Sequence, residues 1–251
     1  MSTDQALTPE LDSGTVPLGT RIRRVLAAPV RLVGVLVVPD RVMPKLVREE
    51  RSVAAIVALM LCGLFSAWVI GKRIDMTATV FQEDLAAQKK AGPDYEVKSD
   101  RELGEEIVKQ RTIQQVELGL AAGLLNPVLV LHLGMGVFVV GRYVGGRPSF
   151  GGALAASAGS ALPIAVKSLV VGLMAWPSKI LTPPDVSALR SVAVFSAGKL
   201  PFLRFDAFLL WSVILLVFGL AAAAHMSRKR ALTTVVVCFA LFQLLTSGGT
   251  R

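Results

Sequence analysis

The chain has 251 residues, of which 53% are hydrophobic and 18% charged, and its formal net charge is +9. A mean hydropathy of +0.60, with the apolar residues gathered in long blocks, excludes an ordinary water-soluble domain. Membrane orientation and anionic headgroups account for basic residues that flank such blocks, so the positive charge does not indicate nucleic-acid binding.

Residues 1–20 are polar and include Asp4, Glu10 and Asp12, unlike the basic start and apolar middle of a cleaved signal peptide. We expect this segment to be a disordered cytoplasmic tail. In residues 21–51, basic and apolar residues alternate. This pattern predicts a basic amphipathic helix in the membrane interface, acting either as an anchor or as a docking site for a partner.

Five stretches are long and apolar enough to cross a hydrocarbon core, which needs roughly 20 apolar residues. The predicted spans cover about 52–71, 118–141, 150–175, 207–227 and 231–249, within a membrane domain over residues 52–250. The predicted fold is therefore all-α: a polytopic membrane protein with a five-transmembrane-helix bundle and an N-terminal interfacial helix.

The long loop over residues 72–117 is predicted to be external and helical on both sides of a break. A Gly-Pro pair at 92–93 is a helix stop, and Ser99 followed by Glu102 has the pattern of a capping box. We expect a helical hairpin that extends the first two spans. The second external loop, 179–205, suits a segment on the outer interface or a re-entrant one.

Lys and Arg residues are densest before the first span and in the short turns after the second and fourth. This distribution predicts a cytoplasmic N-terminus and an external C-terminus, in a bacterial inner membrane. Trp68, Trp176 and Trp211 would then all lie near the outer interface, which indole rings favour.

Among the polar side chains within the predicted spans, Asn126, His132 and Lys167 are the candidates for a site. Because polar groups are costly in a bilayer, each is a functional candidate. His132 is expected to hydrogen-bond across helices or to serve a substrate or proton path. Lys167 is expected to snorkel outward or to bond a carbonyl. Asn126 is expected to satisfy backbone groups freed by Pro127.

A row of small residues, Gly151, Ala155 and Gly159, recurs at intervals of four in the third span. Such rows allow helices to approach closely in lipid, either within one chain or between two copies. Pro163, deep in the same span, is expected to bend it.

The predicted spans contain no Asp or Glu, and the sequence has no nucleophile set, zinc-ligand pattern or Walker loop. We therefore predict no catalytic residues, no cofactor and no metal site. Cys62 and Cys238 both lie in predicted spans and are expected to pack as small apolar side chains.

Several short segments occur in an order that resembles a known family. They are residues 24–29 (RVLAAP), 145–150 (GGRPSF), 208–211 (FLLW) and 227–231 (SRKRA). Over roughly residues 22–247 their order and spacing resemble bacterial members of the Yip1 domain family. The resemblance implies five spans and a cytoplasmic N-terminus. It also implies a link to membrane trafficking and Rab GTPases in eukaryotic members, and it supplies no catalytic residues.

The predicted function is that of a non-enzymatic membrane scaffold or interaction protein. Its expected partners are the lipid bilayer, other membrane proteins or a second copy of itself, and no nucleic acid is expected. The alternative is a small permease or permease subunit with a polar path through His132 and Lys167. That alternative requires the two side chains to face a common cavity.

Overall fold

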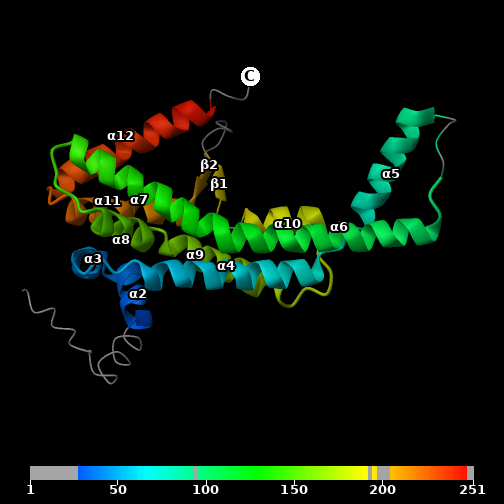
Figure 1. Ribbon diagram of the computed structural model, residues 1–251, viewed down its shortest axis with the longest axis horizontal. Coiled ribbons are helices and arrows are strands. Elements are labelled where there is room, and N and C mark those ends of the chain that lie inside the picture. Colours follow the sequence, from blue (N-terminus) through cyan, green and yellow to red (C-terminus); the bar gives the residue numbers. More distant parts are fainter. Residues whose placement is uncertain (1–27, 93–94, 96, 192–193, 197–203, 248–251) are drawn as a thin grey trace, which may run out of the picture.

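The computed structural model describes residues 28–92, 95, 97–191, 194–196 and 204–247. The predicted tail over 1–20, and residues 21–27 of the predicted interfacial segment, lie outside the described residues. The described chain forms an elongated helical bundle with an arm at one end (Figure 1).

The elements are almost all helices. In chain order the helices are α2 (Ala28–Val37), α3 (Pro39–Arg48), α4 (Val53–Arg73), α5 (Thr77–Ala91), α6 (Asp100–Leu120), the π-helix η2 (Ala121–Leu125), α7 (Asn126–Tyr143), α8 (Phe150–Ser160), α9 (Leu162–Ala175), α10 (Pro183–Arg190), α11 (Ala207–Ala223) and α12 (Arg228–Ser247). Strands β1 (Val194–Ser196) and β2 (Arg204–Asp206) form one antiparallel pair. The helical class is thus confirmed, with a short strand pair that the sequence did not predict.

Three helical segments of the described chain are long and apolar enough to cross a membrane. They are α4, the continuous rod Asp100–Tyr143 formed by α6, η2 and α7, and Phe150–Ala175, formed by α8 and α9. Large apolar side chains point outward from them, including Leu61, Leu129 and Leu173, which are 62%, 60% and 55% exposed. Because lipid solvates such a surface and water does not, the chain is a helical membrane protein.

Two further helices occupy the remaining predicted spans. The apolar helix α11 has 17 residues and is capped by Asp206, and α12 has 20 residues. The third predicted span is interrupted at Ala161, between α8 and α9. Pro163, which is fully buried, lies just after this turn and has no N–H for a helical hydrogen bond. This turn lies two residues before Pro163, the residue that is expected to bend the span.

The small-residue row of α8 packs within the chain. A Cβ on Gly159 would come 2.9 Å from Sδ of Met43 in α3, and one on Gly151 would clash with the carboxylate of Glu50. Ala155 is 0% exposed. The row therefore serves the packing of α8 against α3 and the turn after α3. Its buried positions cannot also contact a second copy of the chain.

The described part of the predicted interfacial segment forms the helices α2 and α3, and both pack on the bundle, α2 through the buried Val35. Met43, Leu46 and Val47 of α3 are buried against α8 and α11. The basic side chains of α3 are exposed on the other face. Its alternation of basic and apolar residues therefore reflects packing on the protein as well as a polar outer face.

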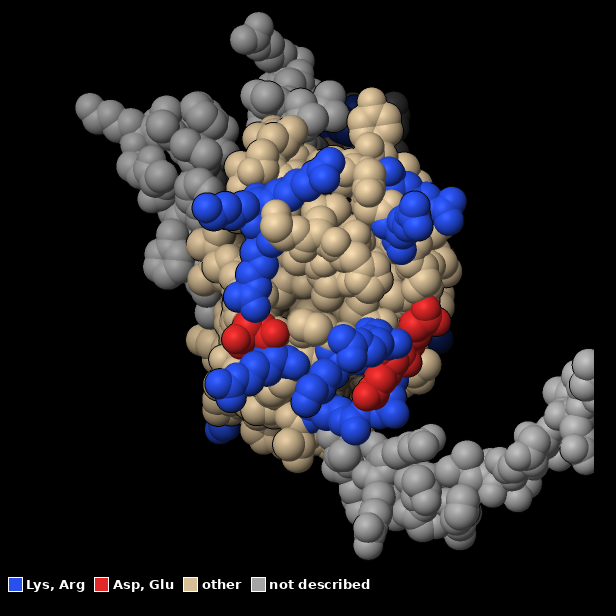
Figure 2. Space-filling model, turned by 90° about the vertical axis from the view of Figure 1, so that its left-hand side faces the viewer, with Lys and Arg blue, Asp and Glu red and all other residues tan. Residues whose placement is uncertain are grey.

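Basic side chains gather at the end of the bundle that carries α3 (Figure 2). Gly146, before α8, packs on the carbonyl of Ala224 after α11, and Ser149 donates a hydrogen bond of 2.6 Å to Glu50 after α3. These contacts bring together the connection from α3 to α4, the connection from α7 to α8 and the connection from α11 to α12. The acidic residues in these connections and the adjoining helix ends are Asp40, Glu49 and Glu50. The basic residues there, together with that of α2, are Arg31, Arg41, Lys45, Arg48, Arg51, Arg142, Arg147, Arg228, Lys229 and Arg230. We call this face the basic end.

At the opposite end, α5 and α6 form the arm. As the sequence predicts, α5 stops at Gly92, whose φ is +66°, and α6 starts with a capping box between Ser99 and Glu102. The two helices diverge and do not lie alongside each other as in a closed hairpin (Figure 1). Val80 is the buried residue of α5 and Leu103 that of α6.

Candidate functional site

Lys167 of α9 forms an ion pair with Asp206, the N-cap of α11. Oδ1 of Asp206 accepts hydrogen bonds from the backbone N–H groups of Phe208 and Leu209 at 2.9 and 3.3 Å, and Oδ2 bonds the lysine. The two charged side chains are 20% and 21% exposed. The pair ties α9 to the start of α11, which differs from the expected snorkelling or carbonyl-bonded lysine.

The segment between α9 and α11 folds back along the bundle. It is fixed at the end of α4, where Leu181 and Arg73 share a backbone hydrogen bond of 2.8 Å and Nε of Arg73 donates to the carbonyl of Ser178 at 2.7 Å. A capping box then begins α10. Helix α10 returns beside α9 and places Arg190 opposite the α4 side chain of Ile70. The choice between an outer-interface segment and a re-entrant one for residues 179–205 stays a prediction, and part of this loop lies outside the described residues.

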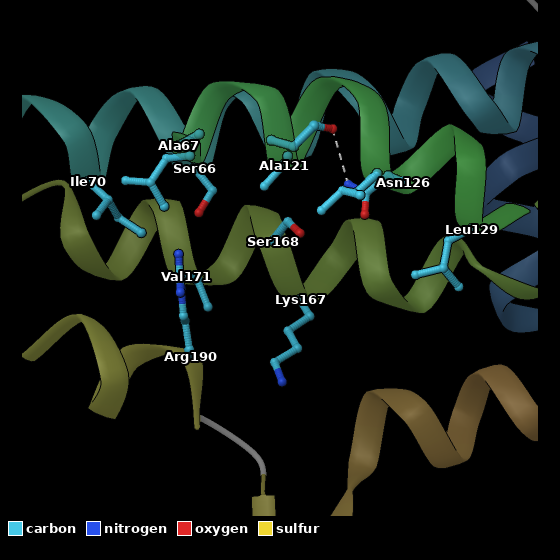
Figure 3. A pocket seen from close by; sticks show the side chains of 14 residues that line it. Ser66, Ala67, Ile70, Ala121, Asn126, Leu129, Lys167, Ser168, Val171 and Arg190 are labelled. Atoms are coloured by element: carbon cyan, nitrogen blue, oxygen red, sulfur yellow. Dashed lines mark hydrogen bonds between the residues drawn. The ribbon is translucent and has the colours of Figure 1, made fainter. Parts of the chain in front are cut away.

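A pocket of about 400 Å³ lies between α4, η2, α9 and α10 (Figure 3). Its polar lining consists of Ser66, Asn126, Lys167, Ser168 and Arg190. Two of the three intramembrane polar residues singled out from the sequence, Asn126 and Lys167, therefore line one cavity. The third, His132, is not part of this lining.

Asn126 is positioned by an irregular turn. The π-helix over residues 121–125 immediately precedes Asn126 and Pro127, and Nδ2 of Asn126 donates to the carbonyl of Ala122 at 3.3 Å. Since Pro127 has no N–H, a carbonyl in this turn lacks its usual partner. Helix α4 approaches closely because Gly63 has no side chain: a Cβ there would lie 3.0 Å from Nδ2 of Asn126. Short π-helical insertions of this kind often mark functional sites.

The remaining polar groups of the pocket come from α4, α9 and α10. The hydroxyl of Ser66 comes from α4 and that of Ser168 from α9. In Figure 3 the side-chain oxygen of Asn126 and the hydroxyl of Ser168 lie between η2 and α9. Arg190 extends upward beside Val171, whereas Lys167 turns away from α4. Among the described residues, Arg190 has no ion pair, so the guanidinium is available to a ligand.

His132 lies on the outer surface of α7. Its Nδ1 is 2.8 Å from the carbonyl of Val128, one turn earlier in the same helix, and its side chain is exposed. This bond replaces the expected bond across helices. Because His132 and Lys167 do not face one cavity, the structure gives no support to a polar path that uses both.

The chemistry of the pocket is suited to binding. It offers one available guanidinium, two hydroxyls and a side-chain amide, next to an ion pair. Within the described residues, no group of His, Cys, Asp and Glu side chains has the arrangement of a metal site. Arrangements of this kind hold a polar or anionic group by hydrogen bonds and charge.

Sequence reasoning missed Asp206 and Arg190. Asp206 directly precedes an apolar run, and an Asp in that position is a known N-cap signal that could have marked it as the start of α11. Its pairing with Lys167 spans 39 residues and depends on tertiary structure. Arg190 sits in a loop that the sequence placed outside the membrane, and no local signal shows that α10 turns back.

Fold and site together define a polytopic helical membrane protein with a polar pocket inside its bundle. Residues 33–248 match the Yip1 domain family, so the chain belongs to that family. No curated protein and no solved structure matches the chain.

Proposed function

We propose that the chain is a five-span, non-enzymatic protein of a bacterial inner membrane that binds other proteins of that membrane. Helices α11 and α12 supply the fourth and fifth spans. The 17 residues of α11 reach about 26 Å, which is close to the hydrocarbon thickness of about 30 Å.

The basic end is the cytoplasmic face in this proposal. It has ten Lys and Arg residues against three acids (Figure 2), as the positive-inside rule requires. Trp68 and Trp176 lie near the other end, with ring centroids 5.9 Å apart, and they form part of the outer aromatic belt. Single cysteines in place of Ser227 and Asp100, in a chain without Cys62 and Cys238, test this orientation. We expect labelling of the first from the cytoplasmic side and of the second from outside.

The exposed arm is the observation that carries the binding proposal. The rod of α6, η2 and α7 has 44 residues, about 66 Å, and therefore extends well beyond a core of about 30 Å. Phe81 and Leu85 lie one turn apart on α5 and are 45% and 53% exposed. An apolar pair on a polar, projecting helix is a contact surface for another protein.

The test compares proteins that co-purify with the chain in native nanodiscs. We expect a stoichiometric membrane-protein partner with the wild type that is lost with Phe81→Glu/Leu85→Glu. The matched control Ala86→Glu/Lys90→Glu adds charge to the opposite face of α5, where both residues are exposed, and should keep the partner. A wild-type chain that purifies alone, or a partner that both variants retain, contradicts the proposal.

A further inference from the structure

The polar pocket lies within the depth of the predicted bilayer. Its α4 lining runs from Gly63 to Ile70, whereas α4 itself runs from Val53 to Arg73. At about 1.5 Å per residue, these positions are roughly 15 and 5 Å from the end at Arg73. Arg190, the last residue of α10, is exposed and lines the pocket together with Ile70, which lies three residues before the end of α4 at Arg73. A guanidinium near this end of the helix can meet the phosphate of a lipid headgroup.

The carboxylate of Asp206, which pairs with the lining residue Lys167, has no oxygen left without a partner. Asp206 binds Lys167 through Oδ2 and two backbone N–H groups through Oδ1. Within the described residues it forms no ion pair with Arg190. Lys167 and Arg190 thus contribute two positive charges, and Asp206 contributes one negative charge. Since Asp206 pairs with Lys167, the positive charge that is left over is that of the Arg190 guanidinium.

The hydrogen-bonding groups suit a tetrahedral anion. A guanidinium donates in a planar fork that matches two phosphate oxygens. The hydroxyls of Ser66 and Ser168, which also line the pocket, can donate to further oxygens. A volume of about 400 Å³ falls within the range of small-molecule sites, about 300–1,000 Å³.

The rim of the pocket opens toward lipid. Leu125 and Leu129 belong to the lining and are also 59% and 60% exposed on the outer surface of the η2–α7 rod. An acyl chain can lie on these side chains while its headgroup enters the pocket.

We propose that this pocket binds a phosphate group, carried by a lipid headgroup or by a small phosphate ester, with Arg190 as the main anchor. The site is independent of the arm and goes beyond the proposed binding of proteins.

The test is native mass spectrometry of the delipidated full chain, titrated separately with phosphatidylglycerol, glycerol 3-phosphate and a phosphate-free glycolipid. We expect one saturable phosphate-bearing ligand for the wild type and weak binding of the glycolipid. Arg190→Gln should weaken binding at least about tenfold, and Arg190→Lys, which keeps the charge without the fork, should lie in between. Arg48→Gln, at the basic end, is the matched control and should bind like the wild type.

The two sources of phosphate give different results. Binding of phosphatidylglycerol alone, lost with Arg190→Gln, identifies a lipid, and binding of glycerol 3-phosphate with the same dependence identifies a soluble ester. Ser66→Ala/Ser168→Ala, which leaves Arg190 in place, should weaken the same ligand. Phosphate binding that persists in Arg190→Gln, or equal binding of the glycolipid, overturns the proposal. Circular dichroism and a monodisperse elution profile establish that each variant is folded.

Discussion

Lys167 and Asp206 form a partly buried ion pair that links α9 to the N-cap of α11, 39 residues further along the chain. One carboxylate thereby caps a helix and neutralises a lysine inside the bundle. Because the pair lies beside the pocket that Arg190 enters, it fixes both the packing of α11 and the charge left to the site. The structural role of Lys167 and Asp206 and the binding role of Arg190 are therefore separable by mutation.

Asp206→Asn should destabilise the protein by about 1–3 kcal/mol, because it leaves Lys167 unpaired while the amide oxygen can still cap α11. Lys167→Met/Asp206→Asn should recover part of this loss, since no charge then remains unpaired. Unfolding in mixed micelles, compared through a double-mutant cycle, measures the coupling. Equal stability of Asp206→Asn and the wild type would show that the pair contributes nothing.

Gly146→Ala should destabilise the chain by about 1–3 kcal/mol. A Cβ at Gly146 would lie 2.6 Å from the carbonyl oxygen of Ala224, and a backbone oxygen cannot move aside as a flexible side chain can. The matched control is Gly136→Ala in α7, where nothing lies within 4 Å of the new Cβ. The control should gain up to about 1 kcal/mol from helix propensity. Thermal unfolding in one detergent compares the two, and similar melting temperatures would refute the close contact.

The helical class and the positions of the apolar helices were predictable because lipid-facing helices need continuous apolar runs. The caps at Gly92 and Ser99 were predictable for a similar reason, since each depends on a few neighbouring residues. Both signals are local. They do not depend on how the helices are arranged in space.

The pocket was only partly predictable. Asn126 and Lys167 interrupt apolar runs and are visible in the sequence, but their common cavity depends on the close approach of α4 at Gly63. Arg190 reaches the cavity because a backbone hydrogen bond between Leu181 and Arg73 directs α10 back along the bundle. Such long-range contacts leave no periodic pattern.

Ser99→Ala should loosen the start of α6 and make it less sensitive to acid. The backbone and side-chain hydrogen bonds of Ser99 hold the pKa of Glu102 below its ordinary value of 4.5. A lowered pKa in the folded chain means that the stabilisation is present above 4.5 and is lost as the pH falls through the folded value. The protection factors of the amides near Asp100, which are exchange rates corrected for the intrinsic pH dependence of exchange, should therefore fall on acidification in the wild type. In Ser99→Ala they should be low already at neutral pH, and protection factors that match the wild type at every pH would contradict the capping role.

Tyr95 should ionise at higher pH than a free tyrosine. Its hydroxyl donates to Asp84 of α5, and this bond, followed by desolvation and the charge of Asp84, raises the pKa of Tyr95 above 10.0. The bond favours the neutral phenol, so the link between α5 and the following loop persists below pH 10.0 and is lost as the pH rises through the higher folded value.

The chain has two tyrosines, so phenolate absorbance of Tyr143→Phe reports on Tyr95 alone. In that background, Asp84→Asn should move the titration back toward the ordinary value, whereas Glu83→Gln, an exposed neighbour, should leave it unchanged. Equal titration midpoints with and without the Asp84→Asn substitution would show that the hydroxyl is not bonded to this carboxylate.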